Sequence, residues 1–132
     1  MKIAGSVTFD LENAQDYSTI YAGVLVGHGT NVTIENCSIG SQESVDESGA
    51  IVTLSDNAQT EINIANNINL HYGDVAGYLT SQVGSVTIPS QRSQIKNSIS
   101  YLDHTINISR NNTINIGSIV GTLTNGSRVY NI

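Results

Sequence analysis

The chain of 132 residues is poor in charge and in cysteine. Charged residues make up only 12% of it, so uncharged Ser, Thr and Asn do most of the solvating. The chain has five Lys and Arg and eleven Asp and Glu. This balance argues against a nucleic-acid partner, because the phosphate backbone binds to a basic protein surface. No apolar run approaches the length of a membrane span. A single cysteine, Cys37, excludes an intrachain disulfide.

Aromatic residues are also scarce, with six Tyr, one Phe and no Trp. A β-sandwich usually fills its core with larger aromatic side chains. Ile and Val are abundant instead, at 17 and 11 residues, and such β-branched side chains suit strands. No window shows an apolar stripe at helical spacing. The composition therefore predicts an all-β chain, and its length predicts one domain, 1–132, that buries its own core.

The most informative feature present is a repeat. Its first half reads Gly-x-aliphatic-aliphatic-Gly and occurs at 23–27, 73–77 and 117–121, with a weaker copy at 49–53. Its second half is a short strand that alternates aliphatic and polar residues. The strand begins at Val7, Val32, Ile62, Val86, Ile106 and Val129, a mean step of about 24 residues. Repeats of this length usually mean a solenoid or an array.

The repeat predicts a β-solenoid, a right-handed parallel β-helix of about five coils, with a β-sandwich as the alternative. In the solenoid the glycine-bounded segments are stacked core strands whose glycines permit tight turns. The expected repeat core is Gly23, Leu25, Gly27, Val32, Ile34, Ile51, Ile62, Ile64, Gly73, Val75, Gly77, Val86, Ile88, Gly117, Ile119, Gly121 and Val129. Strand alternation places Asp74, the acidic residue inside one copy, on the outside.

Asparagine is expected at the corners of the coils. Asn36, Asn66, Asn97 and Asn131 each follow an expected strand. At such corners an Asn side chain can hydrogen-bond to the backbone of the next coil.

Charge is unevenly distributed along the chain. Residues 1–66 carry a net charge of −8 and residues 67–132 a net charge of +2. Sequence order is axial order in a solenoid, so we expect an acidic end and a mildly basic end. The repeat pattern runs from Val7 to Ile132 without a clear cap, and open solenoid ends expose unpaired strands. These features predict a structural module that stacks head to tail on copies of itself or on adjacent repeats of a longer chain.

Residues with catalytic spacing are missing. His28, His71 and His104 are too far apart in sequence to form a local metal pair, and the chain has neither a nucleophile elbow nor a phosphate loop. We therefore expect no catalytic residues, no cofactor, no metal and no enzymatic activity. The alternative function is an adhesin module that binds glycan or a host protein through a Tyr/Asn/Thr-rich face. The tyrosines expected in that face are Tyr21, Tyr72, Tyr78, Tyr101 and Tyr130.

The glycine-bounded copies, together with Val32-Thr33-Ile34-Glu35-Asn36-Cys37, resemble the GLUG motif. That motif recurs in large bacterial adhesins and in repetitive surface proteins of some protists. The resemblance implies a β-solenoid stalk or part of a longer surface fibre, located outside the cell or at its surface. The copies here keep one glycine where the motif usually has two. Residues 1–6 lack the apolar core of a secretory signal, so the chain is not secreted, or it is a cut piece or mature form of something longer.

Overall fold

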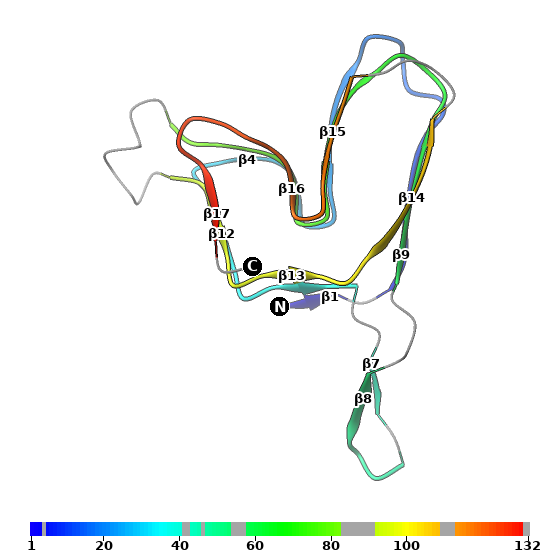
Figure 1. Cartoon of the computed structure of the whole chain (residues 1–132), viewed down its shortest axis with the longest axis vertical. Helices are drawn as coiled ribbons and strands as arrows, with labels where there is room; N and C mark the ends of the chain where they lie inside the picture. Colours follow the sequence, from blue (N-terminus) through cyan, green and yellow to red (C-terminus); the bar gives the residue numbers. More distant parts are fainter. Residues whose placement is uncertain are drawn as a thin grey trace.

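The computed structural model describes residues 1–3, 5–40, 43–45, 47–53, 58–82, 92–108 and 113–130. Within these ranges the chain is all-β and forms five three-stranded parallel sheets and one two-stranded antiparallel sheet. Each parallel sheet joins strands from successive passes of the chain, and the passes superimpose when viewed down the shortest axis (Figure 1). The molecule is a β-solenoid, because a β-sandwich would pair its strands antiparallel.

Each pass around the axis uses four or five short strands. The first coil contains β2 (Val7–Leu11), β3 (Thr19–Gly23), β4 (Val26–Thr30), β5 (Thr33–Glu35) and β6 (Ser38–Ile39). The second coil contains β9 (Gln59–Ile64), β10 (Asn69–Gly73), β11 (Ala76–Thr80), β12 (Gln94–Lys96) and β13 (Ile99–Ser100). The third coil contains β14 (Asp103–Ile108), β15 (Thr113–Gly117), β16 (Val120–Leu123) and β17 (Arg128–Tyr130). Strand β1 (Lys2–Ile3) pairs with β6, one layer before the first coil.

The coil is about twice as long as the sequence spacing indicates. Gly73 pairs in register with Gly23, 50 residues earlier, and with Gly117, 44 residues later. The alternating strands recur after about half a coil because they lie in two different sheets. Ile62 and Ile106 belong to the sheet β14-β9-β2, whereas Val129 belongs to the sheet β17-β12-β5. Five is thus the number of parallel sheets around the coil, and each sheet is three strands deep.

Two expected strands are not the ones that the coil uses. Strand β12 fills the place between β5 and β17 that the spacing assigns to Val86-Thr87-Ile88, which lie outside the described residues. The weaker copy, 49–53, was expected to be a coil strand, and this prediction was wrong. Its strand β8 (Ile51–Thr53) pairs antiparallel with β7 (Glu43–Val45), and Ile51 faces Val45 in register. This hairpin projects away from the coil (Figure 1).

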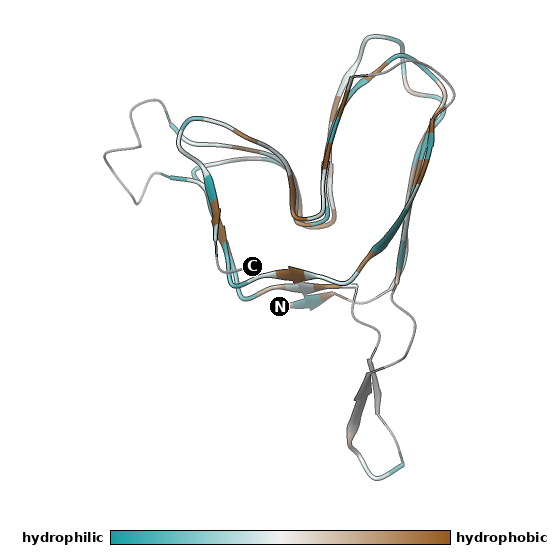
Figure 2. Cartoon of the chain, viewed as in Figure 1, coloured by the Kyte–Doolittle hydropathy of each residue, from teal (hydrophilic) through white to brown (hydrophobic). Residues whose placement is uncertain are grey.

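Strand alternation separates a buried from a solvent-facing set of side chains. In β9, Thr60, Ile62 and Ile64 are buried, while Gln59 and Glu61 are exposed. Hydrophobic and hydrophilic residues alternate in the same way along the stacked strands in Figure 2. Buried side chains form two clusters. One contains Ile34, Cys37, Ile39, Ala58, Val75, Ala76, Leu79, Ile95 and Leu102, and the other contains Ala22, Ile62, Ile64, Ile68, Leu70 and Tyr72.

The glycine-bounded segments are bends between two strands, which corrects the expectation that each is a single core strand. Strand β10 ends at Gly73 and β11 begins at Ala76, and the chain reverses direction between them at the re-entrant bend seen in Figure 1. A Cβ atom added at Gly77 would lie 2.6 Å from the carbonyl oxygen of His71. Glycine is therefore required where the two arms of the bend approach each other, because no side chain fits between the backbones.

Asparagine occupies corners as expected. Asn36 and Asn97 follow β5 and β12, and both adopt the left-handed conformation, with φ of 57° and 51°. Asn66 of the second coil donates its side-chain amide to the backbone oxygens of Glu12 and Ala14 in the first coil. These residues turn the chain and tie neighbouring coils together. Asn131 lies outside the described residues.

Candidate functional site

The third coil exposes apolar side chains that point into the solenoid. Ile106 of β14 aligns in register with Ile62 of β9, yet 39% of Ile106 is exposed against 1% of Ile62. Ile108 aligns with Ile64, and their exposed fractions are 47% and 2%. Among the described strands, Ile62 and Ile64 have a neighbour on both sides along the axis, whereas Ile106 and Ile108 have one on a single side. The exposed face therefore has the character of an opened core.

The two ends of the stack have complementary steps. Four parallel sheets span the first to the third coil, but the fifth has the order β1-β6-β13. As far as the described strands go, this sheet consequently extends one layer further at the N-terminal end and one layer less at the C-terminal end. Among the described residues, no strand pairs with the free edge of β13.

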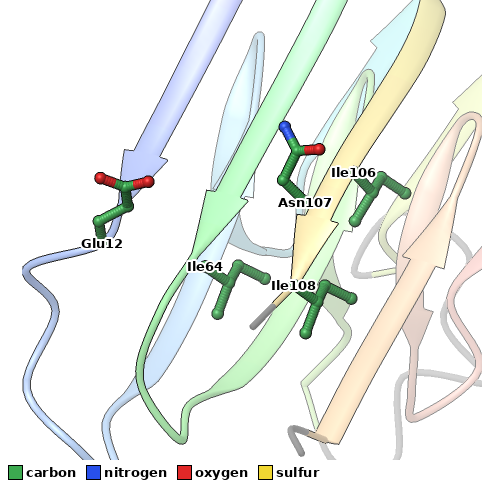
Figure 3. A pocket seen from close by; sticks show the side chains of 5 residues that line it. All are labelled: Glu12, Ile64, Ile106, Asn107 and Ile108. Carbon is green, nitrogen blue, oxygen red and sulfur yellow. The ribbon is translucent and has the colours of Figure 1, made fainter. Parts of the chain in front are cut away.

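An open hollow of about 380 Å³ lies along the sheet β14-β9-β2. It is lined by Glu12, Ile64, Ile106, Asn107 and Ile108 (Figure 3). A glycosidase needs two carboxyl groups that flank the scissile bond. Of the described residues that line this hollow, Glu12 is the sole carboxylate. The hollow thus lacks the acid pair of glycoside hydrolysis within the described part of the chain.

Four aromatic side chains gather on the outer face of the re-entrant bend. Tyr21 of β3 and His71 of β10 are aligned in one sheet, and His28 of β4 and Tyr78 of β11 are aligned in the neighbouring sheet. We call these four residues the outer aromatic cluster. Tyr21 lies 4.9 Å from His28, 5.2 Å from His71 and 5.2 Å from Tyr78 between ring centroids. The rings cover one another, and 39% of Tyr21 remains exposed.

Polar groups surround this cluster. His71 Nδ1 lies 2.7 Å from the Thr122 hydroxyl oxygen, and Thr124 donates its hydroxyl to Tyr78 Oη at 3.3 Å. Burial lowers the pKa of His71, which favours the neutral imidazole. Neutral rings beside hydroxyl groups can stack on a flat apolar surface and hydrogen-bond at its rim.

Asp74 is buried, and the expectation that it points outward was wrong. Its side chain is fully covered and accepts a hydrogen bond from Tyr72 Oη at 2.7 Å. His104 Nε2 lies 2.7 Å from the same carboxylate oxygen, and the Ser100 hydroxyl donates to the other oxygen. Strand alternation fails here because residue 74 lies in the bend between β10 and β11, not in a strand.

This buried network is suited to structure and not to nucleophilic catalysis. The Ser100 hydroxyl bonds to the carboxylate, whereas an activated serine needs a base such as histidine as its partner. Burial raises the pKa of Tyr72, and the hydrogen bond to Asp74 raises it further, so Tyr72 stays protonated as a donor. Asp74 thereby ties the bend to β13 through Ser100 and to β14 through His104.

The remaining expected site residues are distributed as follows. Ile34, Ile62, Ile64 and Val75 are buried. Leu25, Val32, Ile119 and Val129 are partly buried and pack against the same core. Gly23, Gly27, Gly73, Gly77, Gly117 and Gly121 lie in or beside the three stacked bends. Val86 and Ile88 lie outside the described residues.

The tyrosines do not form one exposed row. Tyr21 and Tyr78 belong to the outer aromatic cluster, but Tyr72 is fully buried in the core. Tyr130 stacks against Arg128, 5.4 Å from the guanidinium carbon to the ring centroid. The structure thus combines two of the expected tyrosines with the histidines His28 and His71. The sequence spacing could not show this, because it requires β3 and β4 to fold against each other.

Metal-ligating side chains are dispersed in the ranges that the structure describes, since no three of His, Cys, Asp or Glu gather closely enough to hold a metal ion. Within those same ranges, no helix is long and apolar enough to cross a membrane. No family model, curated protein or solved structure matches the chain. The resemblance to GLUG-motif repeats therefore stays a prediction.

Proposed function

We propose that this chain is a non-enzymatic structural module whose β-solenoid associates end to end, as a segment of a fibre or stalk at the cell surface. The observation that supports this most directly is the exposed inner face of the third coil, where Ile106 and Ile108 point into an opened core. Covering apolar side chains is favourable, and one edge of β14, which no described strand pairs with, also offers backbone groups for pairing. Another solenoid coil satisfies both needs.

A second copy and an adjacent repeat of a longer chain would present the same kind of surface. Either one adds parallel strands to the free edges of the third coil. End-to-end contact between unlike surfaces produces an open fibre when the rotation does not close a ring. The proposed partner is therefore the same module, joined head to tail.

Association can be tested by sedimentation velocity and negative-stain microscopy over a range of concentrations. We expect the mass to rise with concentration and rods one solenoid wide to form. Ile106→Lys should abolish the rise, because it places a charge in the opened core. Thr105→Lys is the matched control, since Thr105 lies on the same strand, is exposed and faces outward in line with Glu61. A protein that stays monomeric at every concentration would rule out self-association.

The outer aromatic cluster favours a second candidate function, an adhesin module that binds glycan. Aromatic faces stack on the apolar face of a sugar ring, and the hydroxyl groups of Thr122 and Thr124 lie next to His71 and Tyr78. A glycan array measures this directly. Tyr21→Ala should remove binding, and Tyr101→Ala is the matched control because 41% of Tyr101 is exposed and it has no ring contact among those described. An array without hits would contradict this function.

A further inference from the structure

We propose that successive copies of this chain dock in continuous parallel register, so that β2 of one copy pairs with β14 of the preceding copy and Thr8 lies beside Thr105. This inference rests on the proposed end-to-end association and adds to it the partner surface, the polarity and the register. It is carried by the constant register of the strands, the size match of the facing side chains, the step at the coil ends and the placement of charge.

The register between coils is the same at both interfaces of the sheet β14-β9-β2. Strand β9 aligns Ile62 with Phe9 on one side and with Ile106 on the other. It also aligns Ile64 with Leu11 and with Ile108. Continuing this register places Phe9 of the next copy over Ile106. The two most exposed inward residues of β14 are then covered by the apolar residues of β2.

Side-chain sizes also match across the proposed interface. In the sheet β15-β10-β3, the same register brings Ile116 against Ala22 of the next copy. In the sheet β16-β11-β4, it brings Leu123 against Gly29 of the next copy. Ile116 and Leu123 are each 37% exposed, and Ala22 and Gly29 are small, so large side chains meet small ones. Interdigitation of this kind fills a core without strain.

The step at the coil ends selects one rotational setting. Strand β1 stands one layer ahead of the first coil, and the described strands leave the same layer open over β13. Head-to-tail docking places β1 of the next copy over β13, in the register that β1 has with β6. Ile3 then covers Ser100, and Lys2 lies beside Ile99, which is 43% exposed. Two C-terminal ends placed face to face would leave the step unfilled and would make the strands antiparallel.

Charge favours the same polarity. Residues 1–40 hold Lys2 against Asp10, Glu12, Asp16 and Glu35, a net charge of −3, and residues 101–132 hold Asp103 against Arg110 and Arg128, a net charge of +1. In the register of β17 and β12, Tyr130 of one copy would lie opposite Glu35 of the next, with Arg128 on the diagonal. Within the chain, the Glu35 carboxylate already forms an ion pair with Lys96 of the neighbouring coil, with 2.9 Å between Lys96 Nζ and Glu35 Oε2. Lys96 lies on the opposite side of Glu35 from the proposed contact. Opposite charge therefore meets at the head-to-tail contact, and like ends repel.

Disulfide trapping tests the register. Thr8→Cys and Thr105→Cys are combined in a Cys37→Ala background, because Thr8 and Thr105 are exposed and outward-facing. Within one molecule both align with Glu61, so two strand spacings, about 9.6 Å, separate them and preclude an intrachain bond. Between docked copies the Cα atoms would be about 4.8 Å apart, which a disulfide spans. Mild oxidation should then give a ladder of covalent multimers on a non-reducing gel.

Three controls fix the interpretation. Either single variant can give no more than a dimer. The displaced pair Thr8→Cys/Asp103→Cys lies two residues out of register and should give at least about tenfold less multimer. Sedimentation is measured on the same reduced samples. If those samples assemble but the displaced pair or the single Thr105→Cys variant cross-links best, the register is overturned and end-to-end association stands. If the samples do not assemble and no ladder forms, both proposals fail.

Discussion

The second and third coils contain equivalent strands in identical register, but only the second has a described neighbour on both sides. Ile62 and Ile106 are the same residue type at the same position of the coil, and one is buried while the other is half-exposed. Burial in this molecule is thus decided by the neighbouring coil more than by the residue itself. A repeat of this kind contacts only its neighbours, so its stability is a sum of coil and interface contributions.

The outward side of the same strands behaves differently. Asn107 of the third coil donates its side-chain amide to Asn63 of the second coil at 2.7 Å, and this contact is on the solvent side. This bond joins the second and third coils, so it does not depend on a further coil beyond the third. The contrast in burial between the coils is therefore largest for inward-facing residues such as Ile62 and Ile106, and substitutions can test it from the strongest to the weakest effect.

The largest difference in stability between substitutions in the second coil and in the third coil is expected at the bends. Asp74→Ala should lower the free energy of unfolding by about 3–5 kcal/mol, because Tyr72, Ser100 and His104 lose a buried charged partner. Ser118 occupies the same place in the third coil, directly after the aligned glycine, and is exposed. Ser118→Ala should change stability by less than about 0.5 kcal/mol. Urea denaturation measures both, and equal losses would show that the network contributes nothing special.

Truncation of the aligned isoleucines should give the next largest difference. Ile62→Ala is expected to cost about 2–5 kcal/mol, since it leaves a cavity in a packed core. Ile106→Ala should cost about 1 kcal/mol in the monomer, where much of the side chain is already in water. Denaturation at low and high protein concentration measures both. The difference in cost between Ile62→Ala and Ile106→Ala should become smaller at concentrations where copies associate. A difference that does not depend on concentration would argue against the association of copies over the third coil.

Alkaline pH should affect the second coil through Tyr72. Its pKa lies above the ordinary value of about 10, so the unfolded chain releases this proton at lower pH than the folded chain does. The stabilisation is complete below pH 10 and is lost as pH rises beyond it. Tyr72→Phe should remove up to about 1.4 kcal/mol per pH unit from the slope of stability between pH 10 and 11. The measurement is the urea midpoint against pH, and unchanged slopes would refute the assignment.

The smallest effect is expected on the outer face. Asn63→Ala and Asn107→Ala each break the same side-chain bond, so each should cost about 0.5 kcal/mol, and nearly the same amount in either coil. A double-mutant cycle measures the pair. A much larger loss for Asn63 would show that position along the axis also matters on the solvent side.

The sequence predicts the fold class well because apolar alternation and stacked glycine segments are local patterns. It misjudges the coil length because similar strands occur twice in one coil, as at Ile106 and Val129 in the third, and spacing cannot distinguish a half turn from a full one. Strand β12 escapes notice because Gln94-Ile95-Lys96 has one apolar residue.

The buried network and the outer aromatic cluster could not be predicted for a different reason. Asp74 follows a glycine at a bend, so the two-residue period that assigns it to the outside does not apply there. The outer aromatic cluster joins Tyr21 to Tyr78, which requires knowledge of how two sheets fold against each other. Both features are tertiary and depend on the close approach at Gly77.

The alignment of strands between coils does not depend on the length of the connections between successive strands. Thirteen residues separate Thr80 from Gln94, but four separate Leu123 from Arg128, and the strands on either side still align. The hairpin of β7 and β8 likewise leaves the coil between β6 and β9 without displacing either strand from its sheet. Such a frame can carry grafted peptides at its corners, so a module built this way could diversify what it displays while its axis stays constant.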